Sequence, residues 1–108
     1  MQPSAIAKSA NALALGRILD QTNDYVVARR NALIGIWAGD SLGLAGDALA
    51  RYVVEVMESD LEEIGHRDIL RRLMGDFARA GIAIDGGDIE NAIDDCHRAA
   101  YREFLVTD

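Results

Sequence analysis

The amino-acid sequence predicts an all-α protein, a four-helix bundle whose first helix is long or kinked. Apolar residues recur at every third or fourth position through most of the chain, which is the spacing of one face of an α-helix, whereas strand-like alternation is hard to find. Glycines mark the breaks between these segments, and the single proline, Pro3, lies near the start. A chain of 108 residues that is 50% hydrophobic is long enough for one domain with its own core.

The first 22 residues differ in character from the rest of the chain, because they are rich in alanine and carry large apolar residues at spacings suited to an amphipathic helix. Those large apolar residues are Ile6, Leu13, Leu15, Ile18 and Leu19. We expect residues 1–22 to form an N-terminal amphipathic arm or helix and residues 23–108 to form the helical bundle domain. Asn23 and Asp24 could cap a new helix, or they could lie inside one long bent helix, so the boundary stays open.

The best-defined helix of the bundle is predicted from about Tyr25 to Gly43. Its apolar stripe consists of Val26, Leu33, Ile36, Trp37 and Leu44. Trp37, the only tryptophan, is expected in the core. The same helix has a glycine at every fourth position, Gly35, Gly39 and Gly43, at a cost of about 1 kcal/mol each relative to alanine. We interpret this smooth stripe as a tight crossing with a neighbouring helix rather than as a dimer face.

Three further helices are predicted after this one. Gly43 and Gly46 stop the first helix and Asp47 caps the second, whose stripe consists of Leu49, Val53, Val56, Met57, Leu61 and Ile64. A short third helix lies between Gly65 and Gly81, with Leu70, Leu73, Phe77 and Ala80 on one face. Asp85, Gly86 and Gly87 are read as a turn, after which Ile89, Ile93, Cys96, Ala100 and Phe104 line the last helix. Amphipathic helices with short connections pack most simply as an antiparallel bundle.

Charge and composition exclude several classes of partner and location. Eighteen acidic against eleven basic residues give a formal net charge of −7, which repels phosphate groups, so nucleic acid is not expected as a partner. The longest apolar run, residues 32–39, is too short for a membrane-spanning helix, which needs about 20 residues. No continuous apolar region precedes a cleavage site near the N-terminus. The lone Cys96 fits a reducing compartment, and we expect a cytoplasmic protein.

One pattern resembles a bundle metal site, since Glu63 and His66 on one segment and Asp94 and His97 on another each form a carboxylate-x-x-His pair. Gly65 interrupts the first pair and would place its two members at a helix end and in a turn. We therefore interpret these residues as exposed polar side chains and expect no metal or other cofactor.

No group of residues points to catalysis. The chain has no phosphate-binding glycine loop with its lysine, and Cys96 lies on a predicted core stripe, where an inert thiol is expected. The acidic run of Glu55, Glu58, Asp60, Glu62 and Glu63 is typical of a solvated helix face. We predict that the protein is not an enzyme and works by binding a partner.

Two adjacent arginines supply a candidate binding feature. Arg29 and Arg30 project about 100° apart on a helix, so both cannot lie on the same apolar stripe. We expect one arginine to pair with a carboxylate of a neighbouring helix, such as the acidic end of the second, while the other is free for a partner or an anionic ligand. Pairing with structural carboxylates alone is the alternative.

The segment from Ala28 to Ala38, with the sequence Ala-Arg-Arg-Asn-Ala-Leu-Ile-Gly-Ile-Trp-Ala, resembles the zeta-subunit family of alphaproteobacterial F-type ATP synthases. The similarity extends to Leu42-Gly43-Leu44, to residues 60–65, to Asp68-Ile69-Leu70-Arg71-Arg72 and to the Gly81-Ile82 turn. It covers about residues 28–93. The resemblance implies a four-helix bundle without enzymatic activity, whose founding member inhibits ATP hydrolysis by inserting an N-terminal segment between rotor and stator parts of the catalytic head.

The N-terminus departs from the family pattern. Inhibitory members begin with a charged segment that contains phenylalanines, whereas residues 1–19 here have no aromatic residue and only Lys8 and Arg17 as charged side chains. The apolar stripe of this region could fold back on the bundle or pair with a second copy, in which case inhibition would be poor; it could also stay exposed until it docks on the synthase.

Two functions therefore remain open: an inhibitory subunit of the F-type ATP synthase, and a divergent paralogue that binds another protein or a small anionic ligand without inhibiting. The expected partner is the catalytic head, which would place the protein in the cytoplasm and at the periphery of the inner membrane, as a monomer or weak homodimer. The candidate partner- or ligand-binding residues are Ile6, Leu13, Arg29, Arg30, Asn31 and Trp37.

Overall fold

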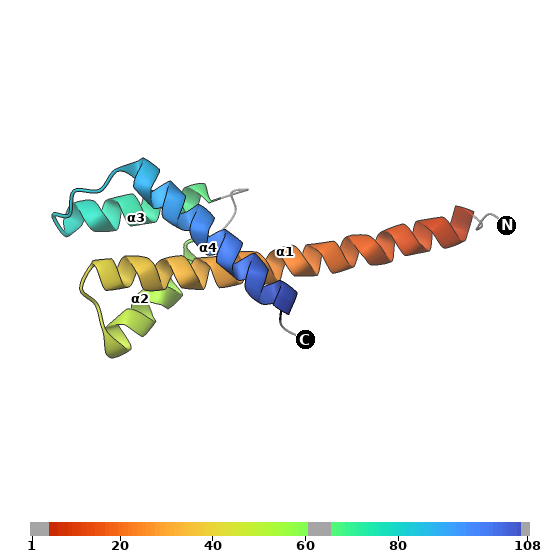
Figure 1. Ribbon diagram of the computed structural model, residues 1–108, viewed down its shortest axis with the longest axis horizontal. Helices are drawn as coiled ribbons and strands as arrows, with labels where there is room; N and C mark the ends of the chain where they lie inside the picture. The colour runs from red at the N-terminus through yellow and green to blue at the C-terminus, as the bar shows by residue number, and fades with distance from the viewer. Residues whose placement is uncertain (1–4, 61–65, 107–108) are drawn as a thin grey trace.

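The computed structural model describes residues 5–60 and 66–106, with side chains from residue 23 onward. Four helices and no strand occur in these two ranges, which confirms the all-α four-helix bundle. The helices are α1 (Ala5–Ser41), α2 (Gly46–Glu58), α3 (Arg67–Arg79) and α4 (Gly86–Val106). Figure 1 shows that α2 and α4 both pack against the C-terminal half of α1, while α3 lies beside α4.

Helix α1 is one continuous helix of 37 residues. Asn23 and Asp24 lie in its interior, so neither begins a new helix, and the boundary that the sequence left open is not a helix end. In Figure 1 the N-terminal half of α1 extends away from the other three helices, and the molecule measures 65 × 27 × 20 Å. The apolar N-terminal segment is therefore not folded back on the bundle.

The crossing of α1 with α2 is as tight as the glycine stripe predicted. A methyl group added to Gly35 would lie 3.2 Å from the Val53 Cα atom, and one added to Gly39 would lie 3.1 Å from the Tyr52 ring. These two glycines let the helix backbones approach closely. Gly43 has another role just beyond the end of α1, because its φ of 82° lies in the left-handed region, and a methyl group added there would have no atom within 4 Å.

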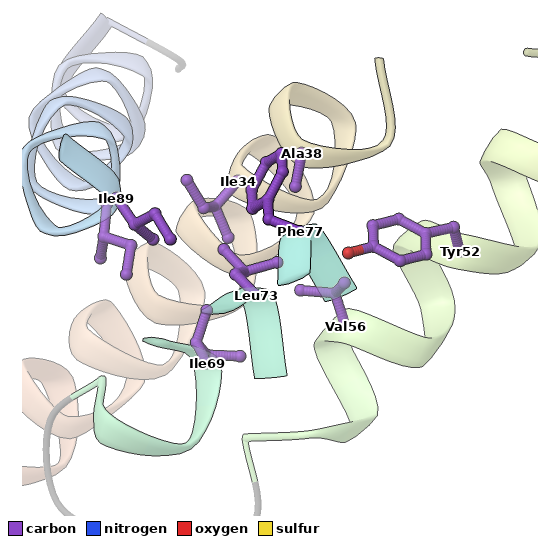
Figure 2. Close-up of a cluster of buried hydrophobic side chains, with 9 residues drawn as sticks. Ile34, Ala38, Tyr52, Val56, Ile69, Leu73, Phe77 and Ile89 are labelled. Atoms are coloured by element: carbon purple, nitrogen blue, oxygen red, sulfur yellow. The ribbon is translucent and has the colours of Figure 1, made fainter. Parts of the chain in front are cut away.

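The core lies where α1, α2, α3 and α4 meet, and Figure 2 shows its side chains pointing toward one another. The cluster consists of Ile34, Ala38, Tyr52, Val56, Ile69, Leu73, Phe77, Ile89 and Ile93. Five expectations for this core need correction. Ile36 is 44% exposed, Met57 and Phe104 are each 36% exposed, and Ala80 is exposed at the end of α3. Trp37 is half-buried at the core margin, where its ring meets that of Phe77 edge-on at 5.8 Å.

The physical reason for the corrections on α1 is that two helices cover it on adjoining sides. The buried face follows Val26, Arg30, Ile34 and Ala38 at intervals of four residues, and the glycine side faces α2. Small residues therefore occupy the centre of the contact. The bulkier side chain of Trp37 packs at the margin of the core against Phe77 of α3, and Ile36 is exposed.

The helix ends also differ in detail from the sequence expectations. Helix α2 ends at Glu58, whereas its stripe was expected to continue through Leu61 and Ile64, which lie outside the described residues. Its N-cap residue is Ala45, and Asp47 lies in the first turn instead of at the cap. Gly86 and Gly87 belong to the first turn of α4, and the Asp85 carboxylate accepts a hydrogen bond from the Gly87 amide at 3.3 Å.

Candidate functional site

Arg29 joins α1 to the C-terminal part of α4. Its Nε atom donates to Glu103 Oε2 at 2.6 Å and its Nη2 atom donates to Glu103 Oε1 at 3.4 Å. This hydrogen bond raises the pKa of Arg29 and lowers the pKa of Glu103. The expectation that one of the two arginines is free of an intramolecular partner is therefore wrong, because α4 places a carboxylate opposite the more exposed one.

Arg30 and Asn31 form a buried polar network with Asp60, which lies just beyond the end of α2. Two nitrogen atoms of Arg30, Nε and Nη2, donate to Asn31 Oδ1 at 3.1 and 2.9 Å, and Asn31 Nδ2 donates to Asp60 Oδ2 at 2.8 Å. The Arg30 Nη2 atom is 3.8 Å from the same carboxylate oxygen. The predicted pairing of one arginine with the acidic end of the second helix is confirmed for Arg30.

Burial sets the electrostatics of this network. Desolvation lowers the pKa of Arg30, against the opposing charges of Asp60 and Asp94. An arginine that is 5% exposed and an asparagine that is 3% exposed, both satisfied internally, hold α1 to the end of α2. This arrangement leaves Arg30 and Asn31 little surface to offer a ligand. We therefore keep ligand binding by Arg30 and Asn31 as a proposal.

The remaining candidate residues are placed apart from this network. Trp37 lies further along α1, half-buried against Phe77. Ile6 and Leu13 lie on α1, in the part that extends away from the bundle, and their side chains are outside the described part of the structure. The structure therefore brings Arg30 and Asn31 together and leaves the other four candidates separate.

Of the two carboxylate-x-x-His pairs, the structure describes His66, Asp94 and His97. Glu63 lies outside the described residues, and the Nε2 atom of His66 is 3.9 Å from Glu90 Oε1, a partner that the sequence did not suggest. His97 is exposed on α4. Across residues 5–60 and 66–106, no three or more His, Cys, Asp and Glu side chains are close enough to hold a metal ion.

Cys96 lies half-buried against the core, as the stripe on α4 suggested. Burial and the neighbouring Asp95 carboxylate raise the pKa of the Cys96 thiol, against the opposing effect of Arg30. The thiolate that a nucleophile requires is thereby disfavoured.

Sequence reasoning missed two features. Asp76 accepts hydrogen bonds from Tyr52 Oη at 2.7 Å, from Arg72 Nε at 2.8 Å and from Arg79 Nη2 at 2.5 Å, which ties α2 to α3. The second feature is an aromatic contact between Tyr25 of α1 and Phe104 of α4, whose ring centroids are 5.7 Å apart. The sequence could have suggested this contact, because each of the two predicted helices carries an aromatic residue.

Comparison with known proteins places this arrangement in a family. A family model described as ATPase inhibitor subunit zeta matches residues 19–103. The chain belongs to the ATPase inhibitor subunit zeta family. The match includes the whole of α2, α3 and the part of α1 that carries Arg29 to Trp37, and it stops within α4 at Glu103. No curated protein and no solved structure matched the chain.

Membership of the zeta family indicates the general function of the protein. An ATPase inhibitor subunit is a regulatory protein, and it acts on its enzyme by binding. The family assignment that the Arg-Arg-Asn to Trp segment suggested is thus confirmed. Within the described residues, none of the helices has the length and apolar character that crossing a bilayer requires.

Proposed function

We propose that this chain is a regulatory subunit of the F-type ATP synthase that binds the catalytic head and blocks ATP hydrolysis. The observation that carries the proposal is the match of residues 19–103 to the ATPase inhibitor subunit zeta family. The bundle supplies the scaffold, and its partner is a protein and not a small substrate. Binding to the head would hold the chain at the periphery of the inner membrane, on the cytoplasmic side.

The N-terminal half of α1 is the part we assign to inhibition. It projects from the bundle as a continuous helix, so it is free to enter a gap between moving parts of the enzyme (Figure 1). A helix with an apolar stripe binds an apolar groove of a partner. Ile6 and Leu13 are the candidate contacts in this segment, together with the other large apolar residues before Asp20.

Two observations favour the second candidate, a paralogue that keeps the bundle and does not inhibit. The family match begins at residue 19, so most of the projecting segment lies outside the matched range. Residues 1–19 also lack the aromatic residues and dense charge of the inhibitory members. In this second case the bundle would bind another protein or a small anionic ligand.

ATP hydrolysis by the cognate catalytic head discriminates between the two functions. The full chain and a form lacking the first 20 residues are each titrated into the head, after thermal unfolding has shown that both forms are folded. Inhibition by the full chain that disappears in the shortened form supports the proposal. Absence of inhibition by either form supports the paralogue.

A further inference from the structure

The C-terminal half of α4 presents an exposed surface of unusual composition for this protein. His97, Arg98, Tyr101 and Arg102 line a surface hollow of about 310 Å³, and Leu105, 61% exposed, continues the same face by one turn. We call these five residues the α4 surface. Tyrosine and arginine are enriched among the residues that dominate binding energy at protein interfaces.

The α4 surface is cationic although the whole chain carries a net charge of −7. Arg98 pairs with Asp95 three residues before it, but both side chains are largely exposed, and ion pairs of this kind contribute little. Neither His97 nor Arg102 forms an ion pair within the part whose side chains are described. Positive charge on this face is thus available to a partner, while the preceding half of α4 carries the acidic side chains of Asp88, Glu90 and Asp94.

The position of the α4 surface connects it with the projecting part of α1. Arg29 and Glu103, with Tyr25 and Phe104, join the end of α4 to α1 close to the point where α1 leaves the bundle (Figure 1). The α4 surface lies on another face of the same part of α4, so a protein that receives the N-terminal half of α1 reaches it by extending over the outer side of α4. Two contacts on one partner strengthen binding more than either alone, because the second forms without a new encounter.

We propose that the α4 surface docks a carboxylate-rich segment of the catalytic head, with carboxylates on Arg98 and Arg102 and an apolar side chain in the hollow beside Tyr101. This inference rests on the proposed function and adds the contact surface and the chemistry of its partner. An anionic membrane or a nucleic acid fits less well, since an extended anionic surface would also meet the acidic remainder of the molecule. A single protein segment meets only the local positive charge.

A second basic hollow serves as the matched control. Arg67, Leu70, Arg71 and Met74 of α3 line a hollow of about 240 Å³. Its two arginines have the same four-residue spacing as Arg98 and Arg102, and Arg71 pairs with Asp68 as Arg98 pairs with Asp95, but no aromatic side chain takes part. Reversing the charge of either arginine pair changes the net charge of the protein equally.

The test measures binding of the full chain to the purified catalytic head for wild type, R98E/R102E, Y101A and the control R67E/R71E. All substituted side chains are exposed, so helicity by circular dichroism should be unchanged. We expect R98E/R102E to weaken binding by about tenfold or more and Y101A to weaken it with little change in salt dependence. Wild-type binding should fall as salt rises, and R67E/R71E should bind as wild type does.

The outcomes separate the inference from the proposed function. Wild-type binding that R98E/R102E leaves unchanged, or that R67E/R71E weakens as strongly, overturns the α4 surface while the proposed function stands. No binding of wild type to the head overturns the proposed function and the inference together. Vesicles of anionic phosphatidylglycerol are the remaining probe, and retention of wild type but not R98E/R102E on them, without binding to the head, would assign the surface to a membrane instead.

Discussion

At the scale of single residues, Gly39 is the described glycine at which an added methyl group would meet another helix most closely. We predict that Gly39→Ala destabilises the protein by about 1–3 kcal/mol, although alanine favours helix by about 1 kcal/mol. The added methyl group would lie 3.1 Å from the Tyr52 ring, which a hydrogen bond to Asp76 holds in place, and would also clash with Leu49 Cδ1. Chemical denaturation measures the change.

Gly75→Ala is the control for this prediction. Gly75 lies inside α3, and the nearest atoms to an added methyl group, at 3.1 Å, belong to the flexible end of the Arg79 side chain. Because that guanidinium can move aside, we expect alanine to stabilise the protein by about 0.5–1 kcal/mol through helix propensity. Stabilisation by both substitutions would contradict the tight crossing of α1 with α2.

The Asp76 carboxylate predicts a pH dependence of stability. Burial alone would raise its pKa, but hydrogen bonds from Tyr52, Arg72 and Arg79 outweigh burial, and the pKa of Asp76 lies below its ordinary value. A lowered pKa in the folded state stabilises the protein above the unfolded pKa of about 4, and that contribution is lost as the pH falls through the folded pKa. Acid should therefore weaken the link between α2 and α3.

We predict that Asp76→Asn lowers the free energy of unfolding at neutral pH by about 1–3 kcal/mol and flattens its decline below about pH 4. Denaturant titrations across acidic pH measure both effects. Asp95→Asn is the matched control, since Asp95 is exposed and its ion pair among the described side chains is with the exposed Arg98. An identical decline in wild type and Asp76→Asn would show that Asp76 does not supply the acid sensitivity.

At the scale of elements, the backbone of α1 is one continuous helix, but its two halves have different surroundings. Its C-terminal part is covered by α2 and α4 and carries buried Ile34 and Ala38, whereas residues 5–22 extend beyond the other helices. Isolated helices of this length are marginal in water, because most helix stability in proteins comes from tertiary packing. One continuous helix should thus have two very different local stabilities.

Hydrogen exchange tests this division. We expect the amides of residues 5–22 to exchange many times faster than those around Ile34, and the protection to rise at the point where α4 meets α1, near Arg29. Uniform protection along α1 would indicate that the N-terminal half has a packing partner, such as a second copy of the chain. Repeating the measurement in the presence of the catalytic head should raise protection in residues 5–22 if that half enters the enzyme.

At the scale of the whole molecule, the extended N-terminal half of α1 determines the overall size. The radius of gyration is 17.8 Å, whereas a compact domain of this length has about 13 Å. We predict that small-angle scattering of the monomer gives about 18 Å and that removal of the first 22 residues lowers it to about 12 Å. A value near 13 Å for the full chain would mean that the N-terminal half folds back in solution.

Most of the architecture could be predicted from sequence, for reasons that are visible in particular residues. The helix ends at Gly43 and Gly81 have φ values of 82° and 72°, a backbone conformation that glycine alone adopts without strain, so their positions follow from residue type. Leu73 and Phe77, four residues apart, were placed on one face and are both buried. Helix ends and stripes depend on neighbours within a turn or two of the chain.

The sequence by itself thus determined the helical class, the crossing at Gly35 and Gly39 and the family, because periodicity, glycine spacing and motif identity are local properties. Only the tertiary structure decided which arginine is buried, since Arg29 finds Glu103 74 positions away and Arg30 finds Asn31 and Asp60. It also placed Trp37 at the core margin and left the α4 surface uncovered. A helical pattern states which residues share a face, whereas the exposure of that face depends on where the other helices pack.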